Sequence, residues 1–275
     1  MSDIPSSQKL EIASRFLLES PPGEVNDVFN DIRVLVNDDD LLQEGIVPAL
    51  GEHNTDQLVT ARVPDQEYEV IITKHGQIEG DRFIDPRSKK SFRFDHLRQV
   101  ASEVEEWTPE ESTEPLRAAV EEAVDAYLSD HYPNGVSSVF ARDGNITVAI
   151  VDNKYNPTNY WNGRWRSVWT LNAGDLRGSM HVNVHYYEDG NVQLTTTNSK
   201  EANLNLSSDP KTAAKTIVTE ITRLESAFQG ALIRCYSELA EDTFKSLRRT
   251  LPVTRNKLDW HKILNYRIGE EIGKQ

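Results

Sequence analysis

Apolar residues recur at helical spacing in the N-terminal part of the chain. A short stripe occupies residues 12–17, and a longer one occupies residues 25–35. The Pro-Pro-Gly segment at 21–23 separates the two stripes, because proline lacks an amide donor and clashes inside a helix. The acidic run at 37–40 ends the second helix and offers N-caps for a third. This pattern predicts short antiparallel helices joined by tight breaks.

The spacing of apolar residues then shortens. Brief runs of strand character, some separated by turn-like residues, occupy 58–63, 67–73, 81–84 and 91–94. These runs predict a small β meander. The following segment, 103–114, is acidic and poor in apolar residues, which favours a solvated linker.

A longer β region follows a helix that begins near Pro115. Its apolar runs lie between residues 136 and 197, and the turns at 143–145 and 188–190 have hairpin composition. Five strands joined by consecutive hairpins predict an antiparallel sheet. The last strands form an edge, which invites pairing with another chain.

A heptad-like seam marks the next element. A helix over 210–247 would be about 57 Å long at 1.5 Å per residue, so it needs a broad sheet or a partner helix beneath it. Cys235 lies in the seam, and we expect it to be a buried structural thiol rather than a nucleophile. The seam residues are Ile217, Ile221, Leu224, Phe228, Ala231 and Cys235.

Pro252 separates this helix from a short amphipathic segment at 256–268. Trp260, Leu264 and Ile268 share one of its faces. Such a short helix is marginal in water, so we expect an arm that orders on a partner.

These elements predict an α+β fold with five segments. The predicted segments are a helical stalk at 1–56, a β module with an acidic linker at 57–114, a helix with the central sheet at 115–208, the long helix at 209–250 and the C-terminal arm at 251–275.

Composition places the chain among soluble globular proteins. It has 275 residues, and its apolar runs are shorter than the roughly 20 residues that span a bilayer. The polar N-terminus predicts no secretory signal. A single cysteine fits a reducing compartment, so we expect the cytosol.

The net charge is −14, but the C-terminal segment is basic. An acidic body with a basic end favours contact with an acidic protein surface, an anionic lipid or a nucleic acid. The alternative is that these cations complement the dipole at a helix C-terminus. The basic residues of interest are Lys245, Arg248, Arg249, Arg255 and Lys257.

The familiar motifs of catalysis, phosphate binding and metal binding are missing from the sequence, so we predict no enzyme, no cofactor and no metal site. His181 and His185 share a strand face without an evident third ligand, which favours packing over metal binding. Trp161, Trp165 and Trp169 alternate with arginines, a pattern that can stack nucleotides. We favour packing against the long helix or a partner, because the acidic body opposes nucleic acid.

Several segments, in order along the chain, resemble the F-actin capping protein alpha subunit family. They lie at 21–31, 92–97, 160–167, 185–194 and 247–260. The resemblance implies a helical stalk, a small β module and an antiparallel sheet covered by a long helix. It also implies an obligate heterodimer with a beta subunit of similar fold, in which the two sheets join.

The resemblance further implies that the chain blocks the barbed ends of actin filaments independently of calcium, in the cytoplasm and at cortical actin. The resemblance also implies that the C-terminal segment is an actin-binding arm, and we expect its face with Trp260, Leu264 and Ile268 to dock on actin. The family's basic cluster corresponds to Lys245, Arg249 and Lys257, with Arg248 and Arg255 beside it. Phosphoinositides are expected to compete for these residues. The alternatives are capping of actin-related filaments, as in dynactin, or a phosphoinositide or membrane adaptor that uses the same basic arm.

Overall fold

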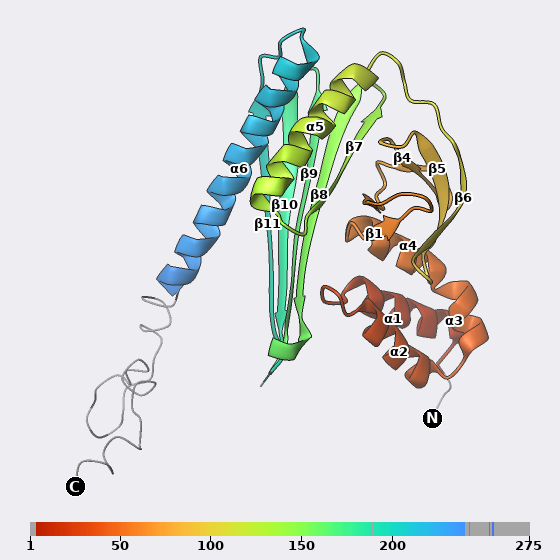
Figure 1. Cartoon of the computed structure of the whole chain (residues 1–275). Coiled ribbons are helices and arrows are strands. Elements are labelled where there is room, and N and C mark those ends of the chain that lie inside the picture. The colour runs from red at the N-terminus through yellow and green to blue at the C-terminus, as the bar shows by residue number, and fades with distance from the viewer. Residues whose placement is uncertain (1–3, 189, 240–241, 243–252, 254, 256–275) are drawn as a thin grey trace. The chain divides into compact units, whose positions relative to one another are not determined.

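The computed structural model describes residues 4–188 and 190–239, together with 242, 253 and 255. The chain divides into two compact units, Met1–Leu224 and Glu225–Gln275. Helices come first, followed by short strands, a helix, five longer strands and a last helix (Figure 1). This order confirms the predicted α+β fold, whereas the five-segment division stays a prediction.

The N-terminal helices form around the predicted breaks. The four helices are α1 (Ser6–Leu18), α2 (Val25–Val36), α3 (Asp39–Gly45) and α4 (Val47–Asp56). Asp38 caps α3, because its carboxylate accepts the amide of Leu41 at 3.1 Å. Leu17, Leu42 and Ile46 belong to a buried core shared by the four helices. The prediction had not separated α4 from α3.

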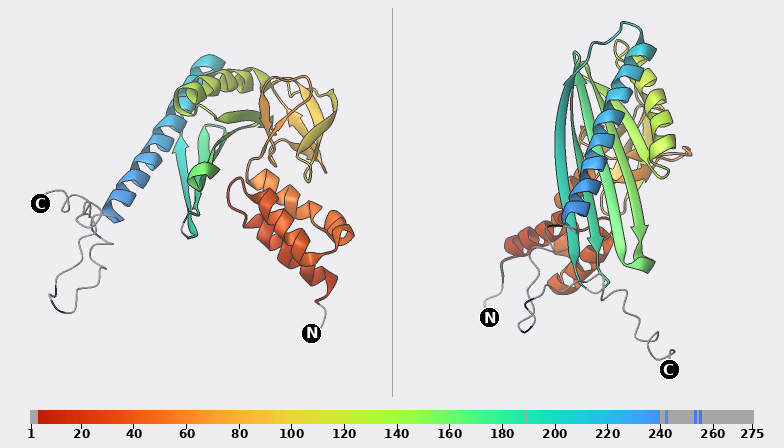
Figure 2. Two further views of the ribbon diagram at one scale, coloured as in Figure 1. Left: turned by 60° about the horizontal axis from the view of Figure 1, so that its bottom comes forward. Right: turned by 90° about the vertical axis from the view of Figure 1, so that its left-hand side faces the viewer.

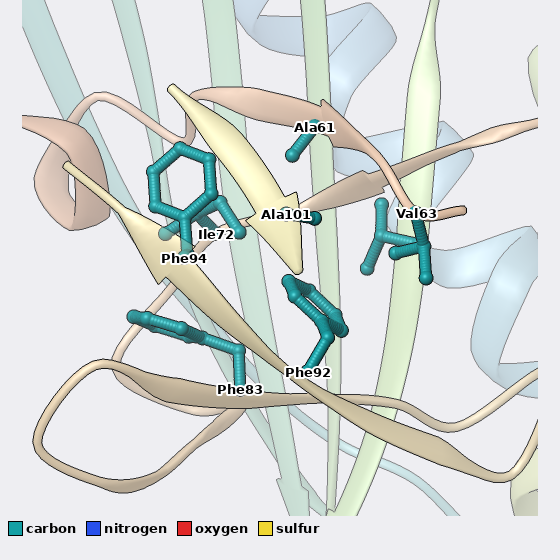
Figure 3. Close-up of a cluster of buried hydrophobic side chains, with 8 residues drawn as sticks. Ala61, Val63, Ile72, Phe83, Phe92, Phe94 and Ala101 are labelled. Atoms are coloured by element: carbon teal, nitrogen blue, oxygen red, sulfur yellow. The ribbon is translucent and has the colours of Figure 1, made fainter. Parts of the chain in front are cut away.

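The small β module consists of two sheets. Its strands are β1 (Thr60–Arg62), β2 (Glu69–Ile71), β3 (Gln77–Glu79), β4 (Arg82–Asp85), β5 (Lys90–Asp95) and β6 (Val100–Glu106). The first two strands pair with each other, and the other four form an antiparallel sheet. Three phenylalanines, Phe83, Phe92 and Phe94, fill the space between the sheets with small and branched residues around them (Figure 3).

Strand β6 corrects one prediction. Residues 103–106 belong to this strand and not to a linker, because β6 pairs with β5. Its acidic side chains are exposed, and two of them meet cations of β5 and β4. Glu103 lies 3.5 Å from Arg93, and Glu105 lies 3.0 Å from Arg82. The acidic composition therefore marks an exposed strand face.

The central sheet is antiparallel throughout, as predicted. Its order is β11-β10-β9-β8-β7. At the first hairpin, Asp143 and Gly144 have positive φ angles of 52° and 74°, as a two-residue hairpin turn requires. The strands are β7 (Val136–Arg142), β8 (Asn145–Asn156), β9 (Trp161–Asn172), β10 (Asp175–Tyr186) and β11 (Val192–Asn203).

Different elements cover the two faces of this sheet. Helix α5 (Glu114–His131) packs on β7 and lies over one face of the sheet (Figure 2). The ring of Tyr132, which follows α5, lies 6.0 Å from Trp165, so this is the face that carries the tryptophans. We call this the helix-side face. The β module covers the other face, where Ile71 and Ile84 pack with Phe140. The last helix, α6 (Pro210–Glu238), is about 43 Å long.

A buried cation joins α5 to the sheet. The guanidinium of Arg117 donates to Glu114 at 2.7 and 2.9 Å, lies 3.1 Å from Glu121 and also contacts the carbonyl of Val139. Burial opposes the charge of Arg117, but the two carboxylates outweigh it and raise the pKa of the guanidinium. The sequence pattern did not identify this cluster, because three charged residues on a helix usually face water.

We expect Arg117→Ala to destabilise the fold by about 3 kcal/mol, because it leaves two carboxylates near a buried site without their cation. The measurement is the urea midpoint of the protein as purified, in the same assembly for every variant. Arg223→Ala is the matched control, since Arg223 forms an exposed pair with Glu220. Equal urea midpoints for the two variants would contradict a stabilising role for the buried Arg117 cluster.

Two histidines are held neutral near the end of α4. Burial lowers the pKa of His53 and of His96. Asn54 lies between them, with its amide nitrogen 3.3 Å from His96 Nδ1 and its oxygen 3.3 Å from His53 Nδ1. This arrangement requires a lone pair on His96 Nδ1, and therefore a neutral ring.

Because both folded-state pKa values lie below the unfolded value of about 6.5, the unfolded chain binds more protons in acid. The stabilisation that depends on the two neutral rings is therefore fully present above pH 6.5, and it is lost as the pH falls below that value. In His96→Gln, we expect this acid loss to shrink by up to about 1.4 kcal/mol per pH unit. Urea midpoints between pH 7.5 and 5.5 measure the effect, and an unchanged slope would contradict it.

Candidate subunit interface

Strand β11 is an open sheet edge in the part of the chain that the structure describes. It pairs with β10 along its whole length, from Val192 opposite Tyr186 to Asn203 opposite Asp175, without a bulge. Residues 192–199 carry no charge. Long, regular edges without charged or proline residues are templates for another strand. The structure thus supplies the edge that the sequence analysis expected and extends it to Asn203.

The register places the three tryptophans on one face, as predicted. Trp161, Trp165 and Trp169 lie four residues apart in β9, and therefore on one face, opposite Tyr186, Val182 and Gly178 of β10. Trp169 is fully buried, whereas Trp161 and Trp165 are half-buried. The cover of this face therefore ends partway along the strands.

The part of this face that no described residue covers is apolar and reaches the β11 edge. Val192 is 63% exposed and Tyr186 is 39% exposed, while the others are half-buried. We call this surface the open sheet face. Its residues are Trp161, Trp165, Val182, Val184, Tyr186, Val192 and Leu194. An apolar patch beside an open edge has the character of a protein–protein interface.

The second unit also exposes apolar side chains. On the last turns of α6, Ile233 is 68% exposed and Tyr236 is 48% exposed. Cys235 is exposed too, so the expectation of a buried thiol is wrong for this chain by itself. The heptad seam is buried at Ile217 and Ile221 but exposed at Cys235. The seam therefore continues beyond the part that the described residues of this chain cover.

The arginines of β9 lie on the opposite face from the tryptophans. Arg164 donates to Asn153 at 2.6 Å and to Gln57 at 3.2 Å. Arg166 donates to Asn183 and to the carbonyl of Asp56. Burial, with the charge of Arg164, lowers the pKa of Arg166 to about 10. The nucleotide-stacking arrangement is thus not formed, because tryptophans and arginines face opposite ways.

The two histidines of β10 make polar contacts within the chain. His185 donates from Nδ1 to the carboxylate of Glu24 at 2.7 Å, and Asn162 donates to the same oxygen at 2.9 Å. His181 contacts Thr197 and Ser179. Among the described residues, no group of three potential metal ligands occurs, and no helix is long and apolar enough to cross a bilayer. The sequence did not identify Glu24, because its partners lie far along the chain.

Most of the predicted actin-binding residues lie outside the described part of the chain. Of this set, only Arg255 is described, and it is exposed with a positive φ of 56°. The structure therefore does not test the predicted C-terminal site. The residues outside the description are Lys245, Arg248, Arg249, Lys257, Trp260, Leu264 and Ile268.

Comparison with known proteins gives one consistent result. The sequence profile described as F-actin capping protein alpha subunit matches residues 13–271. The "F-actin-capping protein subunit alpha" of Caenorhabditis elegans is 40% identical over 281 residues, which cover 99% of this chain and all of the relative. The protein of the same name from Chaetomium thermophilum is 41% identical and covers 97% of this chain and 96% of the relative.

A solved structure shares the fold. The homodimeric actin capping protein alpha subunit from Plasmodium berghei superimposes with a TM-score of 0.74 and covers 90% of this chain and 98% of its own. Its sequence identity is 21%, so it supports the fold alone. The profile match and the two relatives extend over nearly the whole sequence. The chain therefore belongs to the F-actin capping protein alpha subunit family.

Proposed function

We propose that this chain caps actin filaments as the alpha subunit of a heterodimer with a capping protein beta subunit. The heterodimer binds the barbed end, independently of calcium, and blocks both addition and loss of subunits. The observation that carries the proposal is family membership along nearly the whole chain. Capping requires only that the end be occupied, so we assign no catalytic residue and no cofactor.

The open edge and open sheet face support the need for a partner. A strand paired to β11 would satisfy its free backbone groups, and a partner element on the open sheet face would bury Val192, Leu194 and Tyr186. A partner would also cover Ile233 and Tyr236 of α6. We therefore expect the chain to be unstable without the beta subunit.

The C-terminal segment supplies the proposed contact with actin. Its basic cluster, centred on Lys245, Arg249 and Lys257, is drawn to an acidic surface at the filament end, which speeds encounter. The apolar face with Trp260 and Leu264 then docks in a groove on actin and slows release. Phosphoinositides compete for the same cations. We propose that the heterodimer acts in the cytoplasm at cortical actin.

The first test is elongation from preformed actin seeds with the co-expressed heterodimer. We expect barbed-end growth to stop at substoichiometric protein, with pointed-end growth unchanged, in the presence or absence of a calcium chelator. Normal barbed-end growth with a folded heterodimer would contradict the proposal. Pelleting with anionic vesicles, without any effect on growth, would favour the membrane adaptor. Arrest of an actin-related filament alone would favour the other alternative.

The charge-reversal variant Arg249→Glu with Lys257→Glu tests the basic cluster. We expect capping affinity to fall about tenfold or more, because opposite charges accelerate encounter, and the loss to diminish at high salt. Lys89→Glu with Arg98→Glu is the matched control, since both side chains are exposed in the β module. Unchanged capping by the first variant would contradict the electrostatic step.

Adjacent residues of β11 test the partner surface. Leu194 lies on the open sheet face, and Thr195 points to the opposite face. We expect Leu194→Asp to abolish co-purification of the beta subunit, because a charge would be buried without a partner. Thr195→Asp should retain the beta subunit. Size-exclusion chromatography of the co-expressed proteins measures both, and retention by Leu194→Asp would exclude this face.

A further inference from the structure

Strand β8 changes character halfway along the helix-side face. Ile146, Val148 and Ile150 are buried there, and the next position on the same face is Asp152. The one after it, Lys154, is exposed. An acid therefore stands where the covered, apolar part of the face gives way to the open part.

Asp152 borders the open sheet face. It lies directly opposite Trp165, which in turn lies opposite Val182, and Val182 lies opposite Thr196 on the β11 edge. This row spans three strand spacings, or about 14 Å. Two helices packed side by side are wider than this row. A partner element of that width, lying across the open sheet face from the β11 edge, therefore reaches Asp152.

The described part of the chain compensates the carboxylate of Asp152 only in part. Its Oδ1 is buried and has no hydrogen-bond partner among the described residues. Burial raises the pKa of this carboxyl, and the charge of Lys154 opposes the change only in part. The arginines of β9 cannot help, because Arg164 and Arg166 lie on the opposite face and donate to other residues. Unpaired buried carboxylates are costly and rare.

We propose that Asp152 receives a cationic side chain from the partner subunit. This inference rests on the proposed heterodimer and names one contact within its interface. A positively charged donor stabilises a partly buried carboxylate more than a neutral donor does, since charge-assisted hydrogen bonds are about twice as strong as neutral ones. The partner is thereby selected by charge as well as by shape, because an apolar residue at this place leaves the carboxylate desolvated.

The effect of replacing Asp152 by a neutral residue on subunit association has opposite signs with and without a partner cation. If no cation arrives, Asp152→Asn removes an uncompensated charge and should strengthen or leave unchanged the association of the subunits. If the partner does place a cation there, the same variant leaves that cation buried in the interface without its counter-charge and weakens association. A merely structural role of Asp152 would not produce the second result together with a rescue by glutamate.

The test is subunit exchange in the purified heterodimer, measured with a fluorescently labelled beta subunit. We expect Asp152→Asn to exchange about tenfold faster than the natural sequence, as loss of a partly buried charge pair predicts. Asp152→Glu should exchange at nearly the original rate, because it keeps the charge. Asp143→Asn is the matched control, since Asp143 occupies the exposed turn of the β7–β8 hairpin.

Salt dependence and capping complete the experiment. Added salt should accelerate exchange of the natural heterodimer more than that of Asp152→Asn, which has lost the charge pair. Unchanged or slower exchange by Asp152→Asn, with normal capping by the natural heterodimer, would overturn this inference alone. Failure of the natural chain to form a heterodimer would overturn both this inference and the proposed function.

Discussion

Antiparallel pairing across β8, β9, β10 and β11 is the constraint on which the molecule depends. The register of these strands separates tryptophans from arginines and sends each set to its own face. One face then receives α5, and the other receives the β module and the polar contacts of Glu24 and Arg164. The same pairing leaves β11 without a neighbour in the described part of the chain. Architecture and interface thus follow from one hydrogen-bonded ladder.

The sequence predicted those features that depend on neighbouring residues. The break at Pro21, the cap at Asp38 and the turn at Asp143 are local events, and the structure contains each of them. Strand ends were harder to predict. The outer halves of β8 and β11 are polar, and ladder pairing rather than composition keeps them in strands. Residues 103–106 were misassigned for the same reason.

The site divides in a similar way. The open edge could be predicted because a sheet built from consecutive hairpins leaves its last strand unpaired on one side. The Glu24–His185 contact and the isolation of Asp152 were not, since both depend on residues that meet only after folding. Cys235 shows the converse limit: a heptad pattern identifies a seam, but it does not say whether the chain itself or a partner fills it. The predicted actin-binding residues stand on the family resemblance.

Strand β11 has no outer neighbour among the described residues, and this open edge has a consequence for the cell that makes the protein. A strand of twelve residues with few charges can pair with many unfolded chains besides the proposed partner. If the chain pairs with a beta subunit as proposed, any surplus of this chain would therefore become a substrate for chaperones or proteases. For the proposed heterodimer, balanced synthesis of the two polypeptides is then a requirement that this one strand imposes, and an imbalance would be observed as loss of the surplus chain.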